Sequence, residues 1–386
     1  MSRHPFLTRD AGLGRLAAVL PRLGRDYAAN RNTDAGPLAE TGTTALSPFV
    51  RRRLLEEREV VEAALAEHGT QAAGKFVEEV FWRSYFKGHL ETHPSAWTGY
   101  LSALEEQEER LRTNAGLRRA YEAAVSGRTG IDGFDDWARE LVDGGWLHNH
   151  ARMWFASIWI FTLRLPWELG ADFFLRHLLD GDPASNTLSW RWVAGLHTRG
   201  KPYAARAENI RRFTAGQFSP TGLNEDPVPL EEADPPREVS LSAADAAPPG
   251  DAALLLHLDD LHPETLPLHG ARVTRLSGVL AHLPGASERV RRADAEAMDD
   301  ALDRAGRRFG CEVVPFAPGW EGALPVITAW APVGPSAGAL PPGCLRLRRE
   351  WDTLAWPHAT RGFFRMRTAI PAILRGITSE EAVAIR

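Results

Sequence analysis

Apolar side chains recur at helical spacing through the first 215 residues of the chain. In AGLGRLAAVLPRLGRDY, for example, Leu16, Val19, Leu20 and Leu23 fall on one side of a helix. Pro and Gly separate the segments of this kind, and none of them alternates with the period of a strand. The pattern therefore predicts an all-helical region. The segments with helical spacing are 11–27, 48–69, 73–90 and 133–163.

The pattern changes after this region. A stretch rich in proline and acidic residues, with few large apolar side chains, is typical of a linker. Four short aliphatic runs follow, and a long helical pattern over 287–310 separates the second run from the third. Strands joined through a helix imply a parallel sheet. We therefore predict a mainly α fold with a helical domain, a linker and a small α/β region, over 1–215, 216–250 and 251–386. The aliphatic runs are 252–261, 271–280, 311–316 and 325–334.

Composition narrows the class of protein. The 386 residues are 44% hydrophobic and 25% charged, as in an ordinary globular protein. The formal net charge of −5 argues against binding of nucleic acid by bulk charge, although a local basic groove remains possible. No apolar run has the length of a membrane span, and the first residues lack the apolar core of a signal peptide. We expect a cytoplasmic monomer that does not bind membranes.

Cysteine and tryptophan usage give two further signals. The two cysteines, Cys311 and Cys344, cannot by themselves hold an iron–sulfur cluster or a zinc ion, so we predict no cluster and no metal site. The chain has 13 Trp but only 5 Tyr, and most of the Trp precede residue 200. This helical region therefore holds more indole chemistry than a core of ordinary composition needs.

The segment LLDGDPASNTLSWRW concentrates polar and aromatic residues. Asp182 followed by Pro183 predicts a helix start, with the aspartate as the N-cap. Asp182, Asn186 and Trp190 are then spaced four residues apart and share one side of that helix. A capped core helix with one hydrogen-bonded amide is the simpler interpretation of this segment alone. The alternative is a functional site at a helix N-terminus.

Two other predicted helices repeat the combination of polar and aromatic residues. Asn149, Arg152 and Met153 share one side of a helix, and Glu79, Trp82 and Arg83 share one side of another. Ion pairs between helices around buried Trp would explain each helix separately. An Arg152–Asp180 pair of this kind would need burial and full hydrogen bonding. Together the three helices favour a pocket for a planar ligand with polar edges.

These segments resemble the flavin-binding helical domain of the DNA photolyase/cryptochrome family. The resemblance runs from about Phe6 to about Pro220, with the motifs in the family's order and spacing. It implies an all-helical fold that binds FAD. The segments that carry the resemblance are YAANRN, GTTALS, FVEEVFWRSYF, GRTGIDGFDDWARELVDGGWLHNHARM and LLDGDPASNTLSWRW.

The resemblance assigns residues to the cofactor. Arg152 and Asp180 match the ion pair beside the isoalloxazine, Asp182 the residue at its pyrimidine edge, and Asn186 the residue beside flavin N5. An amide at that point can either donate or accept a hydrogen bond. The other residues that the resemblance places around FAD are Tyr27, Thr43, Thr44, Leu46, Ser47, Phe76 and Gly181.

The resemblance also assigns residues to electron transfer and to DNA. Trp190 and Trp167 match the first two tryptophans of the chain that passes electrons to the excited flavin. The usual third member falls near Ala124, so Tyr121 or a nearby tryptophan is its expected replacement. His150 stands where many relatives have Arg, which weakens one expected DNA contact. The residues that match contacts to a flipped pyrimidine dimer are Glu79, Trp82, Arg83, Asn149, His150, Met153 and Trp192.

The order of the regions departs from the family pattern. A typical photolyase begins with an α/β domain that holds an antenna chromophore, whereas here the α/β region follows the helical one. No glycine-rich fingerprint or chromophore pocket is evident in it, so the sequence does not predict an antenna chromophore. The basic and aromatic tail over 345–371 is compatible with a closing helix or with an element that binds DNA or a partner.

Two functions remain open. The first is a light-driven lyase in which reduced FAD gives an electron to a cyclobutane pyrimidine dimer in UV-damaged DNA and receives it back after the ring opens. The second is a cryptochrome-like blue-light sensor, or another flavoprotein without repair activity. Repair requires a basic rim around the cavity, whereas cations that are distant or paired with carboxylates would favour the sensor. The rim candidates are Arg83, Lys87, His197, Arg199 and Lys201.

Overall fold

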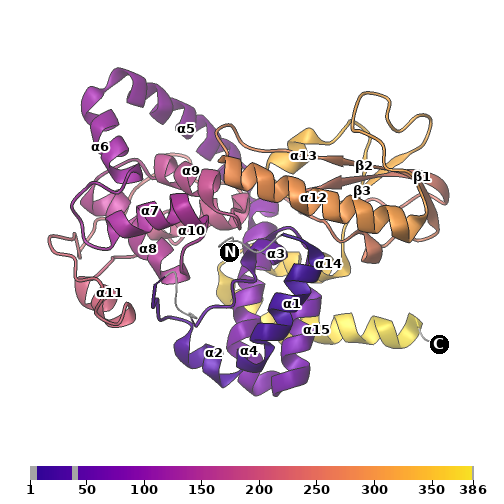
Figure 1. The fold of residues 1–386 in the computed structure, drawn as a ribbon, viewed down its shortest axis with the longest axis horizontal. Helices are drawn as coiled ribbons and strands as arrows, with labels where there is room; N and C mark the ends of the chain where they lie inside the picture. Colours follow the sequence, from indigo (N-terminus) through magenta and orange to yellow (C-terminus); the bar gives the residue numbers. More distant parts are fainter. Residues whose placement is uncertain (1–6, 37–41, 385–386) are drawn as a thin grey trace.

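Helices make up most of the computed structural model, which describes residues 7–36 and 42–384 (Figure 1). The predicted helical region is confirmed. Pro21 divides the first predicted helix into two helices joined by a 3₁₀ turn, because proline cannot continue a helix interior. The helices of this region are α1 (Arg9–Val19), α2 (Arg25–Asn30), α3 (Ser47–Arg51), α4 (Glu57–Thr92), α5 (Ser95–Thr113), α6 (Ala115–Val125), α7 (Phe134–Gly144), α8 (Asn149–Ser157), α9 (Trp167–His177), α10 (Pro183–Val193) and α11 (Ala207–Phe213).

Helix α4 joins the parts of the molecule. It contains the predicted helix 73–90 and the second part of the predicted helix 48–69, whose first part forms α3 and ends at Arg51. It kinks at Gly69, whose φ of 71° only glycine adopts readily. It packs against α2 and α10 in the helical region and against α14 (Glu350–Ala355) and α15 (Phe363–Ala384) near the other end of the chain. Side chains of α4 can therefore contact segments from both ends of the sequence.

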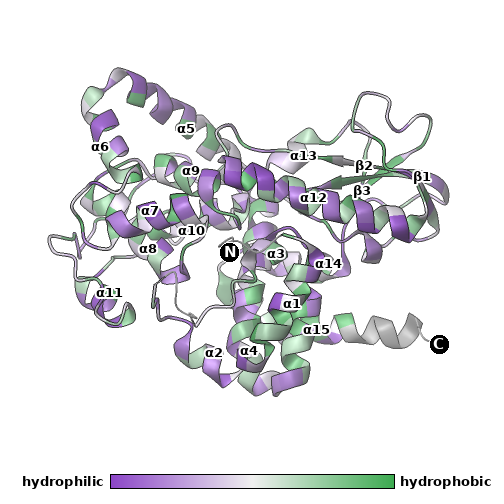
Figure 2. Ribbon diagram, viewed as in Figure 1, coloured by the Kyte–Doolittle hydropathy of each residue, from purple (hydrophilic) through white to green (hydrophobic). Residues whose placement is uncertain are grey.

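The α/β region contains a four-stranded sheet in the order β2-β1-β3-β4, and every strand pair is parallel, as predicted. Helix α12 (Glu288–Phe309) crosses one side of it, capped by Ser287 and ended by Gly310 (Figure 1). The strands are mostly hydrophobic, whereas α12 has long hydrophilic stretches (Figure 2). The remaining elements are β1 (Gly250–His257), β2 (Ala271–Val279), β3 (Val326–Ala329), α13 (Pro335–Ala339) and β4 (Leu345–Leu347).

One predicted strand was wrong and one strand was not predicted. The run CEVVPF forms only an isolated bridge from Val313 to Leu276. Val313 and Phe316 are largely exposed there, and Pro315 lacks the N–H that a strand ladder needs. The tail instead supplies β4, whose three residues are too few to show a periodic pattern.

The predicted helical and α/β regions share a hydrophobic core. One cluster of buried side chains includes Phe49 and Phe81 from the helical region together with Leu254 from β1 and Trp351 and Trp356 from the tail. A second cluster lies among α5 to α11. The tail therefore packs as part of the core, and its last long helix buries Met366, Ile370, Ile373 and Ile377.

Three consecutive arginines tie the two regions together. Arg51, Arg52 and Arg53 are all buried, and the carboxylates that neutralise them come mainly from the α/β region and the tail. Arg51 contacts Asp259 at 3.1 Å, just beyond β1, and Arg53 contacts Asp352 of α14 at 2.6 Å. Buried ions need such partners because desolvation of an unpaired charge is costly.

Candidate functional site

A cavity of about 620 Å³ lies among α4, α8, α10 and the segment that precedes α3. Every predicted site residue lines it except Trp167. The predicted residues in its lining are Tyr27, Thr43, Thr44, Leu46, Ser47, Phe76, Glu79, Trp82, Arg83, Asn149, His150, Arg152, Met153, Asp180, Gly181, Asp182, Asn186, Trp190 and Trp192.

Helix α10 places its side chains as the spacing predicted. The Asp182 carboxylate accepts a hydrogen bond from the Ser185 N–H at 2.8 Å, so the predicted N-cap is confirmed. Asn186, which is 8% exposed, donates its Nδ2–H to the carbonyl of Ala171 at 2.8 Å. This bond fixes the amide and leaves its Oδ1 as a hydrogen-bond acceptor for a ligand.

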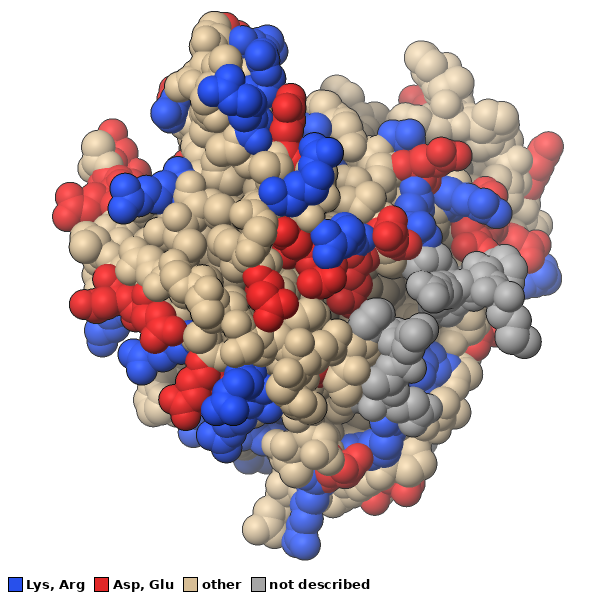
Figure 3. Space-filling model, turned by 60° about the vertical axis from the view of Figure 1, so that its left-hand side comes forward, with Lys and Arg blue, Asp and Glu red and all other residues tan. Residues whose placement is uncertain are grey.

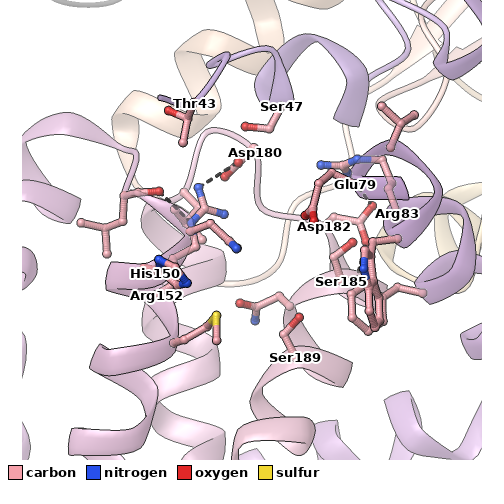
Figure 4. A pocket seen from close by; sticks show the side chains of 18 of the residues that line it. Thr43, Ser47, Glu79, Arg83, His150, Arg152, Asp180, Asp182, Ser185 and Ser189 are labelled. Carbon is pink, nitrogen blue, oxygen red and sulfur yellow. Dashed lines mark hydrogen bonds and ion pairs between the residues drawn. The ribbon is translucent and has the colours of Figure 1, made fainter. Parts of the chain in front are cut away.

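Arg152 and Asp180 form the predicted ion pair, with 2.9 Å between Nη2 and Oδ2 (Figure 4). Burial alone would raise the pKa of Asp180, but the guanidinium outweighs burial and holds the pKa below its usual value. The second carboxylate oxygen, Oδ1, is buried and has no hydrogen bond of normal geometry among the described residues, although the nearby Ser47 hydroxyl also lowers the pKa of this carboxyl. A buried polar atom without a partner in a cavity wall is consistent with a ligand that donates to it.

Asp182 is paired with two cations of α4. Arg83 lies 3.3 Å and Lys87 4.0 Å from its Oδ2 (Figure 4 shows Arg83 and Asp182). Burial would raise the pKa of Asp182, but Lys87 and then Arg83 lower it below its ordinary value. Lys87 is only 1% exposed. Neither cation is therefore free to act as a basic rim.

The other rim candidates divide into two kinds. His197 lines the cavity and lies 2.9 Å from the Tyr85 hydroxyl, and burial lowers its pKa to about 4. It is therefore neutral near pH 7. Arg199 and Lys201 are exposed in the loop after the cavity residue Thr198. Only this loop supplies charges of the predicted kind in an exposed position.

Glu79 has a partner that the sequence interpretation missed. Arg31, just after α2, contacts its Oε1 at 2.7 Å, and both side chains line the cavity. Burial raises the pKa of Glu79, and Arg31 opposes that shift. Next to this pair the Tyr27 ring meets the edge of Phe76, with 5.3 Å between centroids. Arg31 belongs to YAANRN, but nothing in that motif pointed to Glu79.

Aromatic rings form the outer wall of the cavity. The rings of Trp82 and Phe363 are stacked, with 3.7 Å between centroids and 12° between planes. Gly362 and Phe363 line the cavity, although no sequence signal linked them to it. Trp192 stacks on Tyr203 at 5.4 Å.

His150 is held in place by the protein itself. Its Nδ1–H donates to the carbonyl of Asn32 at 2.8 Å, and its ring stacks on Trp154. Burial lowers its pKa, so the ring is uncharged near neutral pH. It therefore lacks the charge that Arg would bring to a DNA phosphate at this position.

Trp190 and Trp167, the two tryptophans predicted to pass electrons to the flavin, have different aromatic neighbours. Trp190 meets the edge of Trp159, with 6.2 Å between centroids, and Trp159 meets the edge of Tyr121 at 6.0 Å. Trp167 instead lies 5.6 Å from Tyr100. A line of aromatic contacts therefore runs from the cavity through Trp159, a residue that the sequence interpretation did not single out.

The surface charge in Figure 3 does not single out a basic face that would bind a nucleic acid. On the side of the molecule drawn in Figure 3, basic and acidic side chains are interspersed among uncharged ones. This agrees with a formal net charge of −5 spread over 95 residues that are either basic or acidic, 45 and 50 respectively. Charges of the two signs so close together do not produce one strong field.

Part of the chain is similar in sequence to DNA photolyases. Residues 76–222 match the family model described as the FAD binding domain of DNA photolyase. The deoxyribodipyrimidine photo-lyase of Streptomyces griseus is 37% identical over 45% of this chain and 39% of its own length. The enzyme of that name from Synechococcus sp. is 28% identical over 57% and 50%. The matched part thus spans at most half of these relatives.

Solved structures of a photolyase and of a cryptochrome are also similar to this chain. A class III photolyase from Agrobacterium tumefaciens matches with a TM-score of 0.44 and 25% identity over 54% of this chain and 43% of its own. A cryptochrome from Synechocystis sp. matches with a TM-score of 0.46, at the same identity and coverage. In the part of the chain that the structure describes, no helix is long and apolar enough to cross a membrane.

Proposed function

We propose that this chain is an FAD-dependent photolyase. The premise is that residues 76–222 belong to the family of FAD-binding domains of DNA photolyase. Its substrate in this proposal is a cyclobutane pyrimidine dimer in UV-damaged DNA, and its reaction is cleavage of the two carbon–carbon bonds that join the pyrimidines. The observation that supports it best is that one cavity collects the residues expected at a flavin together with those expected at a flipped dimer.

The cavity residues suit FAD. Bound FAD in its reduced form would supply light-driven, reversible donation of one electron to the dimer. Arg152 and Asp180 offer a donor and an acceptor side by side, and Oδ1 of Asp180 has no regular hydrogen bond from the part of the chain that the structure describes. Asn186 presents its Oδ1 because Ala171 holds its Nδ2. Phe76 and other apolar side chains exclude water from the remaining wall.

The outer part of the cavity suits a flipped base. Trp192 offers an aromatic wall for stacking, and Met153 offers a polarisable apolar contact. The Glu79 carboxylate, positioned by Arg31, can accept a hydrogen bond from a ring N–H at the edge of a pyrimidine. Asn149 can donate to a carbonyl of the same edge. A flipped base requires this combination of stacking and edge contacts.

A light sensor is the second candidate, because some observations favour it. Arg83 and Lys87 face Asp182 and do not form a free rim, and Phe363 covers one side of Trp82. A protein that uses its flavin only to detect light needs neither a basic rim nor an open aromatic wall.

A repair assay distinguishes the two candidates. The purified flavoprotein is reduced, mixed with an oligonucleotide that contains one thymine dimer, and illuminated with blue light, with a dark sample as control. Photolyase activity predicts loss of the dimer only in the light. Persistence of the dimer, with FAD bound and reduced, would contradict the lyase and favour the sensor. A folded protein without flavin absorption would contradict both.

Variants test whether the cavity performs the reaction. Glu79→Gln should retain FAD and lose at least about tenfold in repair rate, because a hydrogen bond to a charged group is worth roughly 1.5–3 kcal/mol. Its neighbour Glu78 lies outside the cavity lining and pairs with Lys75 at 2.7 Å, so Glu78→Gln is a matched control that should repair at the wild-type rate.

A further inference from the structure

The stacked pair of Trp82 and Phe363 lies where the proposed function needs an open surface. Trp82 of α4 is one of the two expected aromatic walls for a flipped base, and both rings of the pair line the cavity. A centroid distance of 3.7 Å with 12° between planes is the geometry with which a base stacks on an aromatic side chain. The Phe363 ring thus covers one side of Trp82 as a base would.

We propose that Phe363 occupies the place of a stacked base on Trp82 and must leave it before a dimer can bind there. This inference rests on the proposed photolyase function. It makes Phe363 a specificity-determining residue, because only a base that gains more from Trp82 than the phenyl ring does will replace it. A dimer leaves the DNA stack more readily than an undamaged base and so competes best.

The surroundings of Phe363 allow its ring to leave without unfolding of the tail. Phe363 is the first residue of α15, and the helix is anchored one turn later by Met366, which is fully buried. On the other side, the carbonyl of buried Ala359 accepts a hydrogen bond from His89 at 2.8 Å. Gly362 between these anchors is exposed, with no neighbouring atom within 4 Å of a Cβ built there. The backbone at residue 362 is therefore not packed against neighbouring atoms, and besides Trp82 the Phe363 ring meets Tyr85 edge-on at 5.6 Å.

The other two rings of α4 that contact Trp82 are not stacked on it as Phe363 is. Tyr85 meets Trp82 edge-on at 5.5 Å, and Phe86 lies tilted at 5.4 Å. These rings belong to α4 itself and stay in place as long as the helix does. Phe363, which comes from a segment far away in the sequence, is the stacked neighbour that can move separately.

The adjacent phenylalanine provides a matched control. Phe364 is 72% exposed, lies outside the cavity lining and has its ring near the guanidinium of Arg367 at 6.0 Å. Phe364→Ala and Phe363→Ala remove the same side chain one position apart on α15. Phe363→Leu keeps apolar volume in the cavity and removes the planar ring, which protects the test if the alanine variant folds poorly.

The experiment measures equilibrium binding of the FAD-loaded full chain to a duplex with one thymine dimer and to the same duplex without it. Phe363→Ala and Phe363→Leu should bind the dimer duplex about 2- to 12-fold more tightly than the wild type, the factor that one aromatic pair contributes. Phe364→Ala should bind like the wild type. Affinity for the undamaged duplex should not change in any variant, because no base of it needs to stack on Trp82.

The outcomes separate this inference from the proposed function. If the wild type repairs dimers and the Phe363 variants bind them equally or more weakly, Phe363 is a fixed wall and the inference is wrong. If only the Phe363 variants bind dimers, the inference is supported and the native chain is not an efficient photolyase. If FAD is bound and no variant binds dimers, the proposed function and the inference are both contradicted.

Discussion

Asp180 keeps one buried carboxylate oxygen without a hydrogen bond of normal geometry from residues 7–36 and 42–384, although the side chain is only 5% exposed. Buried carboxylates normally accept several hydrogen bonds, because each unsatisfied oxygen costs free energy. Arg152 satisfies only the other oxygen. The proposed cofactor would complete this set of hydrogen bonds.

The first prediction concerns this carboxylate. Asp180→Asn removes the charge that holds Arg152, so FAD affinity should fall about 10- to 100-fold, as expected for loss of a hydrogen bond to a charged group. Titration of the apoprotein with FAD, followed by flavin fluorescence, measures the change. Asp172→Asn is the control, because Asp172 is also buried and paired with an arginine, Arg176, but lies outside the cavity lining. Wild-type FAD affinity in Asp180→Asn would show that Asp180 does not contact the cofactor.

Single residues were predictable from the sequence where local geometry fixes them. Asp182, Asn186 and Trp190 lie on one side of one helix because four residues make about one turn, and all three reach the cavity. The Arg31–Glu79 contact and the Phe363–Trp82 stack join residues 48 and 281 positions apart. No periodicity relates such positions, since the path of the chain between them decides where they meet.

At the scale of elements, the packing of α9 on α10 determines where Trp190 lies. Gly170 of α9 is the point of closest approach, because a Cβ added there would come within 2.3 Å of the Trp190 ring and 2.9 Å of Trp159. Both distances are too short for real contacts. The absence of a side chain at residue 170 is thus a condition for the position of two indole rings.

The second prediction tests this packing. Gly170→Ala should lower the free energy of unfolding by about 1–3 kcal/mol, the usual cost of overpacking a core, and should displace Trp190. Gly99→Ala on α5 is the matched control. Gly99 is exposed, with no atom within 4 Å of an added Cβ, so alanine should raise the free energy of unfolding by about 0.5–1 kcal/mol. Urea unfolding of the two variants and the wild type measures both changes. Equal effects of the two substitutions would contradict a special role for residue 170.

Elements with their own start and stop signals were predictable, and elements that depend on neighbours were not. Helix α12 has Ser287 at its N-cap and Gly310 at its C-cap, and it matches its predicted range. The strand β4 has three residues and exists because β3 offers it a free edge. The run at 311–316 has a strand-like composition, but it lies beside β2 with only one bridge.

At the scale of the whole molecule, buried charge joins the helical region to the rest of the chain. Arg53 contacts Glu57, Asp260 and Asp352, and Arg349 contacts Asp260 at 2.7 Å as well as Glu56. Breaking such a network leaves uncompensated buried charges, which costs several kcal/mol. The tail that positions Phe363 is thus held against α4 by ion pairs as well as by apolar packing.

Buried histidines give the whole molecule a dependence on pH. Burial lowers the pKa of His89 to about 3, of His148 to about 3 and of His197 to about 4, from an ordinary value of 6.5. Below pH 6.5 the unfolded chain therefore binds protons that the folded chain does not. Stability then falls with falling pH by about 1.4 kcal/mol per pH unit for each such histidine, until the folded pKa is reached.

The third prediction follows from this difference in proton binding. The three histidines together should lower the free energy of unfolding by about 4 kcal/mol between pH 7 and pH 5.5, and urea unfolding at both values measures the net change. Two buried carboxyl groups oppose this fall, because burial raises the pKa of Glu140 to about 8 and of Asp172 to about 6, so both gain protons in the folded chain over this interval. His148 is the N-cap of α8, and Asn is a favoured N-cap residue, so His148→Asn removes the titrating group and keeps the cap. Over the same interval this variant should lose about 1 kcal/mol less stability than the wild type, which is the contribution of one such histidine. An equal change in the wild type and in His148→Asn would show that the His148 ring gains protons as readily in the folded chain as in the unfolded one.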